Sequence, residues 1–356
     1  MPKSFNQQII EEFRANGGKV GGPFEGGDLL LLTTTGAKSG QPHTVPLGYV
    51  RDGDLHLVVA SNLGAPRHPA WYHNLLAHPV VRVEVGTEAY EAIAVPAEGT
   101  RRDELFERAV RAAPGYGDYQ SSTARTLPVV ALERPGHAAE EAPREVRTLA
   151  DKFLQIHTWL RGQLRHIRDE ADAHLAARAA HQGPGEPPPP GLGLQIRQHC
   201  LAFCEGLTHH HTGEDDHVFP ALATHHPQLR EPLEHLRDQH RTLARLKDRL
   251  LALLADIATA DPVRFRAELD RISEELTRHL DDEEKWLLPA LAQIPSRRPR
   301  PPSRPIDGRR LAPRDTGEAV QDRVVGQKTG HQPVESHQRL LHQPLRETPG
   351  SPTRYR

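Results

Sequence analysis

Two short stretches in the second half of the chain combine histidine and glutamate at a spacing of four residues. His210 and Glu214 form the first pair, and His279 and Glu283 form the second. Four residues span about one turn of an α-helix, so each pair presents an imidazole and a carboxylate on one helix face. Both side chains are metal ligands, and a carboxylate can bridge two ions. The alternative for the histidine-rich stretch Thr208–Leu222 is a solvated polar patch at the end of a helix.

The apolar residues around these pairs repeat with the period of amphipathic helices. Helical periodicity covers four stretches, at about 146–181, 194–212 with a continuation, 227–255 and 263–292. Each stretch places one histidine on its apolar face, and these histidines are His157, His210, His240 and His279. A single histidine on an apolar face is usually a hydrogen-bonded core residue. Four such helices, two with an aligned glutamate, favour a metal site, because an unpaired buried carboxylate costs several kcal/mol.

The two pairs also belong to an internal repeat. A stretch His-x3-Glu-Asp-x3-Phe-Pro-Ala-Leu begins at His210, and a stretch His-x3-Glu-Glu-x3-Leu-Pro-Ala-Leu begins at His279. In each half, a helix with one inward histidine precedes a helix with a His-x3-Glu pair. Two such halves facing each other predict a dinuclear centre in an all-α bundle. Imidazole and carboxylate without thiolate favour iron or manganese over structural zinc.

This arrangement resembles the hemerythrin-like (HHE) family over roughly residues 146–295. The resemblance implies an all-α four-helix bundle that holds a non-heme centre of two iron ions. It implies terminal ligands at His157, His210, His240 and His279 and bridging ligands at Glu214 and Glu283. It further implies that this centre binds or senses oxygen, nitric oxide or iron.

One position departs from the hemerythrin-like pattern. Oxygen-carrying members have a second histidine one turn after the third-helix ligand, and this chain has Ala244 there. One iron would then lack a protein ligand, which leaves a position for water, dioxygen or nitric oxide. We expect His209, His211 and His217 at the surface or around the ligands, with His217 the one of the three that faces inward. We expect Cys200 to be a buried apolar filler.

The first part of the chain shows a different pattern, of short strands separated by turns. Strands are predicted at 29–35, 44–51, 55–61, 80–85, 89–95 and 129–133, and helices at 5–14, 69–78 and 101–112. The Asp52-Gly53 pair predicts a hairpin turn, because glycine accepts the positive φ of a tight turn. This part is therefore expected to be an α+β domain built on an antiparallel sheet or small barrel.

Polar residues of this domain gather in three strings. In Leu30–Leu47 a strand ends in the turn Gly-Ala-Lys-Ser-Gly, where free amides, Lys38 and Ser39 could hold a phosphate. On its own this turn is a weak signal, and a solvated loop is the simpler explanation. The second string runs from Ala60 to Leu75, and the third is Pro114–Gln120.

In this order and spacing, the three strings resemble the deazaflavin-dependent nitroreductase and quinone reductase family, over about residues 5–135. The resemblance implies a split β-barrel of the FMN-binding type that binds reduced coenzyme F-420 and transfers hydride to a quinone or nitro acceptor. It implies cofactor-binding residues at Lys38, Ser39, His43, Ser61, Asn62 and Trp71. Tyr116 and Tyr119 are implied on the substrate side, where a tyrosine could stabilise or protonate the reduced acceptor. A homodimer formed through the barrel is also expected.

Four positions of this domain depart from the family pattern, and two of them, Gly48 and Ala113, replace aromatic residues found in some members. The family usually has arginine at position 43 and lysine at position 62, where this chain has His43 and Asn62. The loss of two fixed cations weakens the hold on an anionic cofactor tail, and Arg67 or a protonated His43 is expected to compensate. For Trp71 and Tyr72, packing of a helix against the sheet is an equally good explanation.

Composition limits the remaining possibilities. The chain has 356 residues and a formal net charge of -2, so we expect two domains and no basic surface for nucleic acid. It has no signal pattern, no integral membrane segment of about 18 apolar residues, and two cysteines, which favours the cytoplasm. The expected domains are 1–135 and 146–295, joined by a linker at 136–145. Residues 296–356 are rich in proline and arginine and are expected to be a disordered tail.

These features predict an oxidoreductase, an F-420-dependent quinone or nitro reductase fused to a di-iron domain. The alternative is a non-catalytic sensory protein whose bundle binds iron or oxygen and whose barrel binds a cofactor. The two hypotheses differ in whether the purified protein oxidises the reduced cofactor when a quinone or nitroarene is present.

Overall fold

The computed structural model describes residues 4–134, 146–181, 193–255 and 261–295. The expected linker at 136–145 and the expected tail at 296–356 lie outside the described residues. We refer to residues 4–134 as the sheet domain and to residues 146–295 as the helical region.

The sheet domain contains seven strands in the order β2-β1-β5-β6-β7-β4-β3, and neighbouring strands are antiparallel. The strands are β1 (Leu29–Thr35), β2 (Pro42–Gly48), β3 (Val50–Asp52), β4 (Leu55–Val59), β5 (Val80–Val85), β6 (Glu88–Pro96) and β7 (Val129–Glu133). The sequence prediction of an antiparallel sheet is confirmed, with the bounds of β1, β5 and β7 as predicted.

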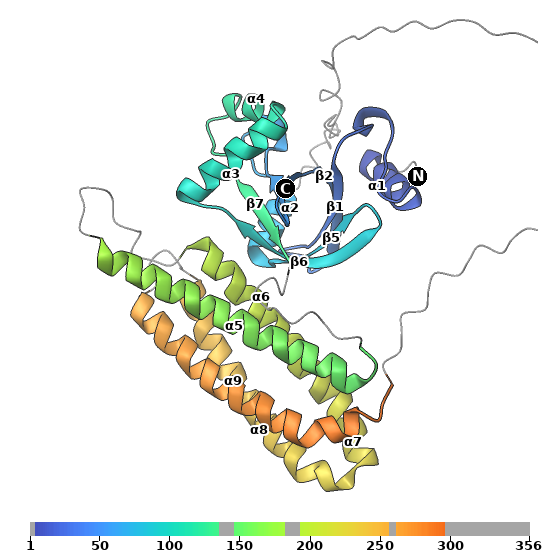
Figure 1. Ribbon diagram of the computed structural model, residues 1–356, viewed down its shortest axis with the longest axis vertical. Coiled ribbons are helices and arrows are strands. Elements are labelled where there is room, and N and C mark those ends of the chain that lie inside the picture. The colour runs from blue at the N-terminus through green and yellow to red at the C-terminus, as the bar shows by residue number, and fades with distance from the viewer. Residues whose placement is uncertain (1–3, 135–145, 182–192, 256–260, 296–356) are drawn as a thin grey trace, which may run out of the picture. The chain divides into compact units, whose positions relative to one another are not determined.

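A break at Tyr49 determines how this sheet curls. The predicted strand at 44–51 is divided there into β2 and β3, which lie at opposite ends of the strand order. Because one residue joins them, the two edges of the sheet must lie next to each other, and the sheet curls strongly (Figure 1). The predicted hairpin turn is confirmed, since Gly53 has a φ of 59° and Asp52 pairs with Leu55.

The helices of the sheet domain are α1 (Phe5–Ala15), α2 (Ala70–Ala77), α3 (Gly99–Ala112) and α4 (Gly115–Ser121), with 3-10 turns η1 (Gly22–Phe24) and η2 (Asn62–Gly64). Helix α2 buries Trp71, Tyr72 and Leu75 against the sheet. Helix α4 was not predicted, because its sequence contains two glycines and it buries no residue completely. Helix α4 therefore lacks the amphipathic pattern by which the other helices of this domain were predicted.

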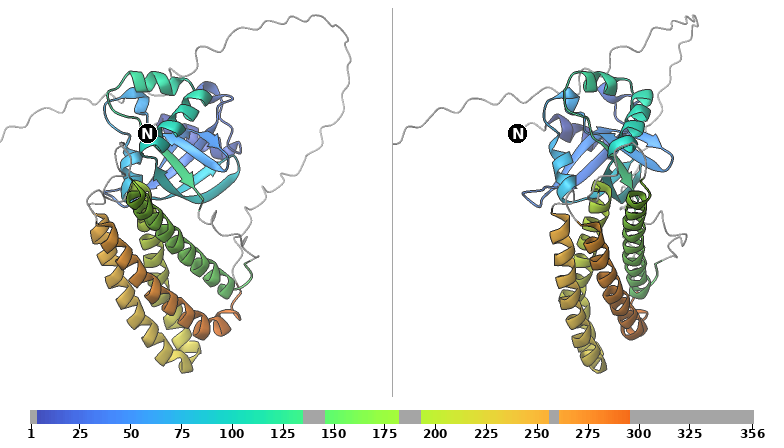
Figure 2. Two further views of the ribbon diagram at one scale, coloured as in Figure 1. Left: turned by 60° about the vertical axis from the view of Figure 1, so that its left-hand side comes forward. Right: turned by 90° about the vertical axis from the view of Figure 1, so that its left-hand side faces the viewer.

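Four long helices form the helical region. They are α5 (Leu149–Ala180), α6 (Leu194–Gly213), α8 (Arg230–Leu254) and α9 (Pro262–Leu291), and between α6 and α8 lie the π-helix η3 (Glu214–Val218), α7 (Phe219–His225) and the 3-10 turn η4 (Pro227–Leu229). The long helices lie side by side in both Figure 1 and Figure 2, and their buried apolar residues form one core.

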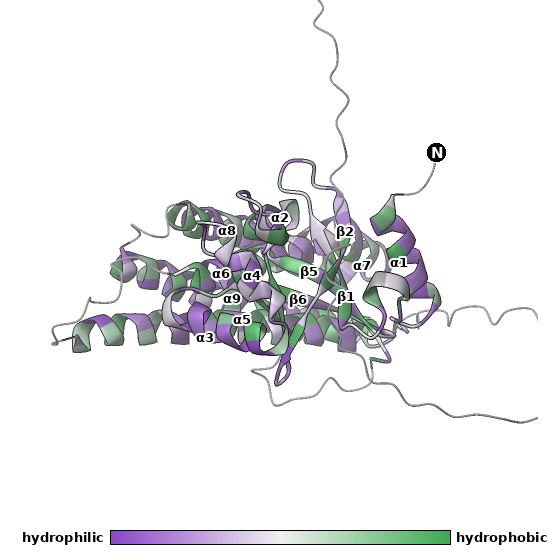
Figure 3. Cartoon of the chain, turned by 90° about the horizontal axis from the view of Figure 1, so that it is seen from above, coloured by the Kyte–Doolittle hydropathy of each residue, from purple (hydrophilic) through white to green (hydrophobic). Residues whose placement is uncertain are grey.

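Figure 3 shows polar and apolar residues alternating along the helices, as the amphipathic pattern predicts. In the part of the chain that is described, no helix combines the length and apolarity needed to cross a bilayer.

The two cysteines are free thiols inside this core. Burial raises the pKa of Cys200 well above its usual range and that of Cys204 to about 12. Neither residue is a thiolate near neutral pH, so neither has the form that binds metals or reacts. The expected role of Cys200 as an apolar filler agrees with this burial.

Phe203 tests the core of the helical region, because it is fully buried there. Phe203→Ala should lower the free energy of unfolding by about 3–5 kcal/mol, since it removes apolar contacts and leaves a cavity. Chemical denaturation followed by circular dichroism measures this change. The control is Phe5→Ala, at a side chain that is 44% exposed, and it should change stability by less than about 0.5 kcal/mol. Equal effects of the two substitutions would contradict this core.

Candidate functional site

Five imidazoles and two carboxylates meet between the long helices. Helix α5 contributes His157, α6 contributes His210 and His211, η3 contributes Glu214, α8 contributes His240, and α9 contributes His279 and Glu283. All seven residues are at most 9% exposed. The four predicted terminal ligands and the two predicted bridging residues are therefore brought together, with one further histidine.

Glu283 lies between two pairs of imidazoles. Its Oε2 is 3.3 Å from Nε2 of His157 and 3.6 Å from Nε2 of His210. Its Oε1 is 3.3 Å from Nε2 of His279 and 3.7 Å from Nε2 of His240. Each oxygen of this one carboxylate thus faces a different pair of nitrogens, as in a carboxylate that bridges two ions.

Glu214 faces the same space as Glu283 and comes from the other half of the internal repeat. Its Oε1 is 3.4 Å from Nε2 of His210, and its Oε2 is 3.4 Å from Nε2 of His240. The donor atoms form two groups, each with all atoms within 4.8 Å of one another, namely His157, His210, Glu214 and Glu283, and His211, Glu214, His240 and His279. Because Glu214 belongs to both groups, the arrangement can hold a pair of metal ions that share ligands.

The nitrogen and oxygen atoms that face the shared space have no hydrogen-bond partners. The atoms that face the shared space and have no hydrogen-bond partner are Nε2 of His157, His210, His211, His240 and His279 and both carboxylate oxygens of Glu214 and Glu283. Buried polar atoms are rarely left unpaired, because each one costs about 1–3 kcal/mol. So many unpaired donors at one point fit a centre whose atoms are satisfied by coordination.

His211 is the donor that sequence analysis missed. We expected His211 at the surface or around the ligands and expected His217 to face inward. The surface position of His211 and the inward position of His217 are wrong, because His211 is buried and His217 is exposed. The ring of His211 stacks on the ring of His240 with centroids 4.0 Å apart, and its Nε2 belongs to the second donor group. Burial lowers the pKa of His211 well below its usual range, so its imidazole is neutral, as a ligand must be. His211 thus places an imidazole in the second donor group, where Ala244 offers none.

The signal for His211 was its place next to a predicted ligand at the end of α6. Consecutive residues of an α-helix differ by about 100° around the axis, so a single-face projection counts one of them and discards the other. The helix changes to a π-helix at Glu214, directly after this turn. A π-helical segment often marks a functional site, and it alters which residues share a face.

Outer hydrogen bonds orient two of the imidazoles. Nδ1 of His157 lies 2.9 Å from Oε1 of Glu284, and Nδ1 of His240 lies 3.1 Å from Oδ2 of Asp215. Each of these acids directly follows a His-x3-Glu pair, and each serves the histidine of the other half of the repeat. A carboxylate that accepts the Nδ1 proton leaves Nε2 of the same ring free to bind a metal ion.

Burial and close contact shift the pKa values of the groups that face one another in this site. Burial and the facing charge of Glu283 raise the pKa of Glu214 well above its usual range. Burial also acts to raise the pKa of Glu283, but its imidazole neighbours outweigh this and hold it well below the usual range. Burial acts to lower the pKa of His240, but the nearby carboxylates of Glu214 and Glu283 raise it to about 10. Without metal, Glu214 and His240 therefore carry protons near neutral pH, and a metal ion that binds to them displaces these protons.

The residues predicted to hold the cofactor tail lie at the turn between β1 and β2, with Lys38 and Ser39 in the turn and His43 at the start of β2. Lys38, Ser39 and His43 are exposed, and Oγ of Ser39 lies 3.3 Å from Nε2 of His43. The backbone N–H of Ala37 donates to Oδ1 of Asn74 at 3.1 Å, which ties this turn to α2. The turn thus presents a lysine, a hydroxyl and an imidazole to solvent on a fixed backbone.

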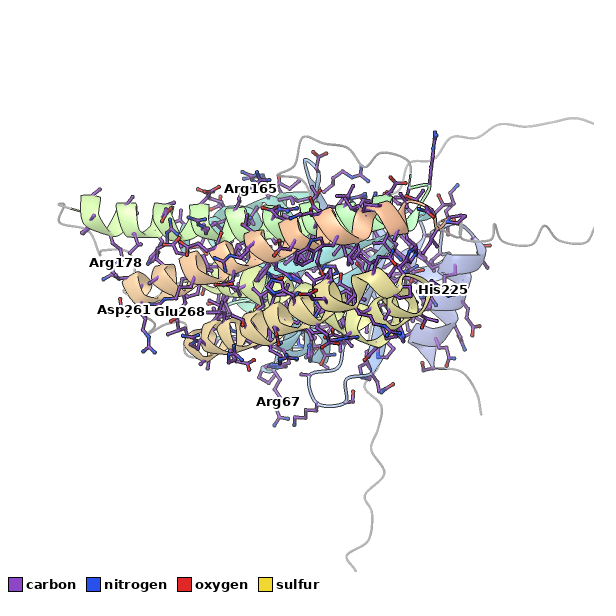
Figure 4. All side chains as sticks on the ribbon, turned by 90° about the horizontal axis from the view of Figure 1, so that it is seen from below. Arg67, Arg165, Arg178, His225, Asp261 and Glu268 are labelled. Carbon is purple, nitrogen blue, oxygen red and sulfur yellow. The ribbon has the colours of Figure 1, made fainter. Side chains whose placement is uncertain are left out.

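Ser61 and Asn62 lie at a strained segment around η2. Asn62 and Leu63 have positive φ angles of 46° and 53°, which are uncommon for residues other than glycine and recur at binding sites. Arg125 supports this segment by donating to the carbonyl oxygens of Ser61 at 2.5 Å and Ala65 at 2.8 Å. Arg125 was not predicted, because no local pattern links it to a loop so far away in sequence. The exposed Arg67, which was expected to compensate for missing cations, extends away from the chain after η2 (Figure 4).

The predicted aromatic residues lie in two environments. Trp71 is 7% exposed and packs in the core of the sheet domain, which agrees with the packing alternative. Tyr116 and Tyr119 meet edge to face with centroids 6.4 Å apart, and the Tyr116 hydroxyl donates to the Gly48 carbonyl at 3.4 Å. Helix α4, which carries both tyrosines, contacts η2. Burial raises the pKa of Tyr116 to about 12, so its hydroxyl stays protonated at neutral pH.

Two family models match the chain. Residues 6–134 match the family described as F420H(2)-dependent quinone reductase. Residues 148–291 match the family described as hemerythrin HHE cation binding domain. The matches cover the sheet domain and the helical region, respectively.

The sheet domain is also similar to individual proteins. F420H(2)-dependent quinone reductases from two strains of Mycobacterium tuberculosis, CDC 1551 and H37Rv, are each 43% identical over 128 residues, which covers 34% of this chain and 85% of theirs. A solved structure described as an F420-H2 dependent reductase is 41% identical and covers 30% of this chain and 94% of that chain, with a TM-score of 0.29. Another solved structure, described as a domain-swapped dimer, is 37% identical. It covers 36% of this chain and 93% of that chain, with a TM-score of 0.30.

Removal of both candidate bridges tests the metal centre. Glu214→Ala combined with Glu283→Ala should abolish the binding of two metal ions per chain, because the shared ligands are lost. Elemental analysis of iron-loaded protein measures this stoichiometry. Glu274→Ala, at an exposed residue of α9, is the control and should leave it unchanged. Two irons retained in the double variant would overturn the ligand assignment.

Removal of the unexpected donor tests the second group separately. His211→Ala should weaken binding of one of the two ions by at least 10–100-fold, the range found when even a supporting partner of a ligand is lost. Iron titration of the metal-free protein measures both affinities. His209→Ala, at an exposed neighbour on α6, should leave both affinities unchanged. If His211→Ala behaves like His209→Ala, His211 is not a ligand.

Proposed function

The chain belongs, through residues 6–134, to the F420H(2)-dependent quinone reductase family, and from this premise we propose that it transfers hydride from reduced coenzyme F-420 to a quinone or nitro acceptor. The curled sheet is then a split β-barrel. The match to the hemerythrin HHE family supports a four-helix bundle with a di-iron centre as the second functional unit. The observation that carries the metal assignment is the set of unpaired nitrogens and oxygens between the long helices.

The exposed β1–β2 turn is proposed to hold the anionic tail of the cofactor. Lys38 supplies a positive charge, and Ser39 and His43 supply a hydroxyl and an imidazole on the same turn. Ser61 and Asn62, on the strained segment supported by Arg125, are proposed to contact the ring. When bound, the deazaflavin supplies a hydride donor, and the protein contributes orientation and exclusion of water.

Tyr116 is proposed to act on the acceptor rather than on the cofactor. Burial raises its pKa to about 12, so the hydroxyl remains a hydrogen-bond donor throughout the neutral range. A neutral phenol can stabilise the oxygen of a reduced quinone or give it a proton. Tyr119, in edge-to-face contact with Tyr116, is proposed to hold that ring and line the same side.

The helical region is proposed to bind two iron ions and a small ligand such as oxygen or nitric oxide. The first ion would have His157 and His210 with the two shared carboxylates, whereas the second would have three imidazoles because His211 is added. On this assignment the first ion would have fewer imidazoles than the second and would keep a position for the small ligand. A cavity of about 270 Å³, lined by His211, His240, Ala244 and neighbouring residues, lies on the side of the second group.

A binding or sensory protein without strong reductase activity is the second candidate. The observation in its favour is the turn itself, where His43, at a position the family usually fills with arginine, lies 3.3 Å from Ser39. A neutral imidazole holds an anionic tail less firmly than a fixed guanidinium does. In this case iron would bind and reduced coenzyme F-420 would bind, without oxidation of the cofactor by a quinone.

Substitution of Tyr116 tests the reductase. Purified protein with reduced coenzyme F-420 and menadione should oxidise the cofactor, and Tyr116→Phe should lower kcat by about 100-fold, since general acid catalysis contributes at least that much. The absorbance of the oxidised cofactor measures the rate. Tyr90→Phe is the control, because the Tyr90 hydroxyl lies 2.6 Å from Nδ1 of His56 and is not among the proposed site residues. No oxidation by the unmodified protein, with iron still bound, would favour the sensory alternative.

A further inference from the structure

A third group of metal-type ligands lies outside the two groups described above. It consists of Glu133 at the end of β7, His166 on α5 and His199 on α6. Nε2 of His199 lies 3.3 Å from Nε2 of His166 and 3.3 Å from Oε2 of Glu133. One ligand comes from the sheet domain and two come from the helical region, so neither part of the chain contains this group by itself.

The distances between these donor atoms suit a tetrahedral ion. Zinc binds imidazole nitrogen and carboxylate oxygen at about 2.0–2.2 Å, which places neighbouring tetrahedral ligands about 3.3–3.5 Å apart. Both measured separations, each 3.3 Å, have this value. Two imidazoles and a carboxylate are also a ligand set that zinc uses together with a water or a fourth side chain.

The carboxylate of Glu133 is held in a ligating orientation. Its Oε1 accepts from Arg101 Nη2 at 3.2 Å, which leaves Oε2 directed toward His199. Arg101 also donates to Gln195, and Gln195 donates to Glu170, so these polar side chains form a continuous outer network. Burial acts to raise the pKa of Glu133, but His199 and Arg101 outweigh it and hold the pKa below the usual range. The carboxylate is therefore ionised, and its second oxygen has the outer support typical of metal ligands.

Packing of α6 against the sheet domain fixes His199 beside Glu133. Gln198 is fully buried, and its amide donates to the backbone carbonyls of Leu75 at 2.8 Å and Ala94 at 3.1 Å. His199 itself is 3% exposed, so its ring cannot turn into solvent. The site is therefore assembled before any ion arrives, which lowers the cost of binding.

We propose that Glu133, His166 and His199 bind a zinc-type divalent ion that links strand β7 to helices α5 and α6. The fourth position belongs to water or to Glu170, whose Oε1 is 3.5 Å from Nε2 of His166. The ion is structural and joins the sheet domain to the helical region. This inference is independent of the functions proposed above, because it uses none of the iron or cofactor ligands.

Zinc stoichiometry in the iron-loaded full chain tests this site. Dialysis of that protein against zinc should give one zinc ion per chain in addition to iron, and zinc-edge X-ray absorption should show two imidazoles at about 2.0–2.1 Å. His199→Gln and Glu133→Gln should each lose this zinc ion and keep the iron. Glu133→Gln preserves the shape of the side chain and covers the case in which His199→Gln fails to fold.

The matched control is His174→Gln, two turns after His166 on α5. It should retain both zinc and iron. The proposal is overturned if the unmodified protein takes up no zinc beyond its iron, or if both variants retain zinc, because the three residues would then form only a hydrogen-bonded polar contact. Loss of iron in every protein would concern the dinuclear centre only. The difference in zinc content between the unmodified protein and the two variants would still decide this proposal.

Discussion

The rest of the helical region depends on two buried carboxyl groups, Glu214 and Glu283, whose charge must be balanced inside the protein. A buried charge without compensation costs several kcal/mol, and here two carboxyl groups face each other, so that ionisation of Glu283 disfavours ionisation of Glu214. Apolar layers close the space on both sides, one around Leu160 and Leu243 and the other around Phe219 and the neighbouring ends of the helices. Compensation must therefore come from the surrounding imidazoles and from the protons or metal ions bound among them, and the low dielectric of these layers strengthens each of those interactions.

The internal repeat explains why this arrangement is stable as a unit. The acid after each His-x3-Glu pair crosses to the other half, so that Asp215 orients His240 and Glu284 orients His157. Arg161 binds Glu284 at 2.6 Å, which extends the same chain of contacts to the surface of α5. Neither half can complete its own ligand geometry, and this mutual dependence favours correct pairing of the two halves over either half alone.

Sequence periodicity was sufficient to predict the inward faces of the long helices. The inward faces of the long helices were correct because a single 3.6-residue period places apolar residues and ligands together, as at Phe203 and His279. It missed His211 because consecutive residues of a helix lie about 100° apart around the axis, so a single-face projection keeps only one of them. The break at Tyr49 was also missed, although Gly48 directly before it disfavours a continuous strand, because the division of the strand follows from the curl of the sheet. The hydrogen bonds of Arg125 and the contact of Glu133 with His199 depend on tertiary packing, for which one sequence carries no local pattern.

His210 and His211 are neighbours in sequence, yet they belong to different donor groups. One peptide unit therefore holds a donor of each group in a fixed relation. On the proposed assignment, an ion bound by His210 would restrict the last turn of α6 and would reduce the conformational entropy that remains to be lost when His211 binds. The two proposed positions would then favour each other's filling, although each keeps its own affinity.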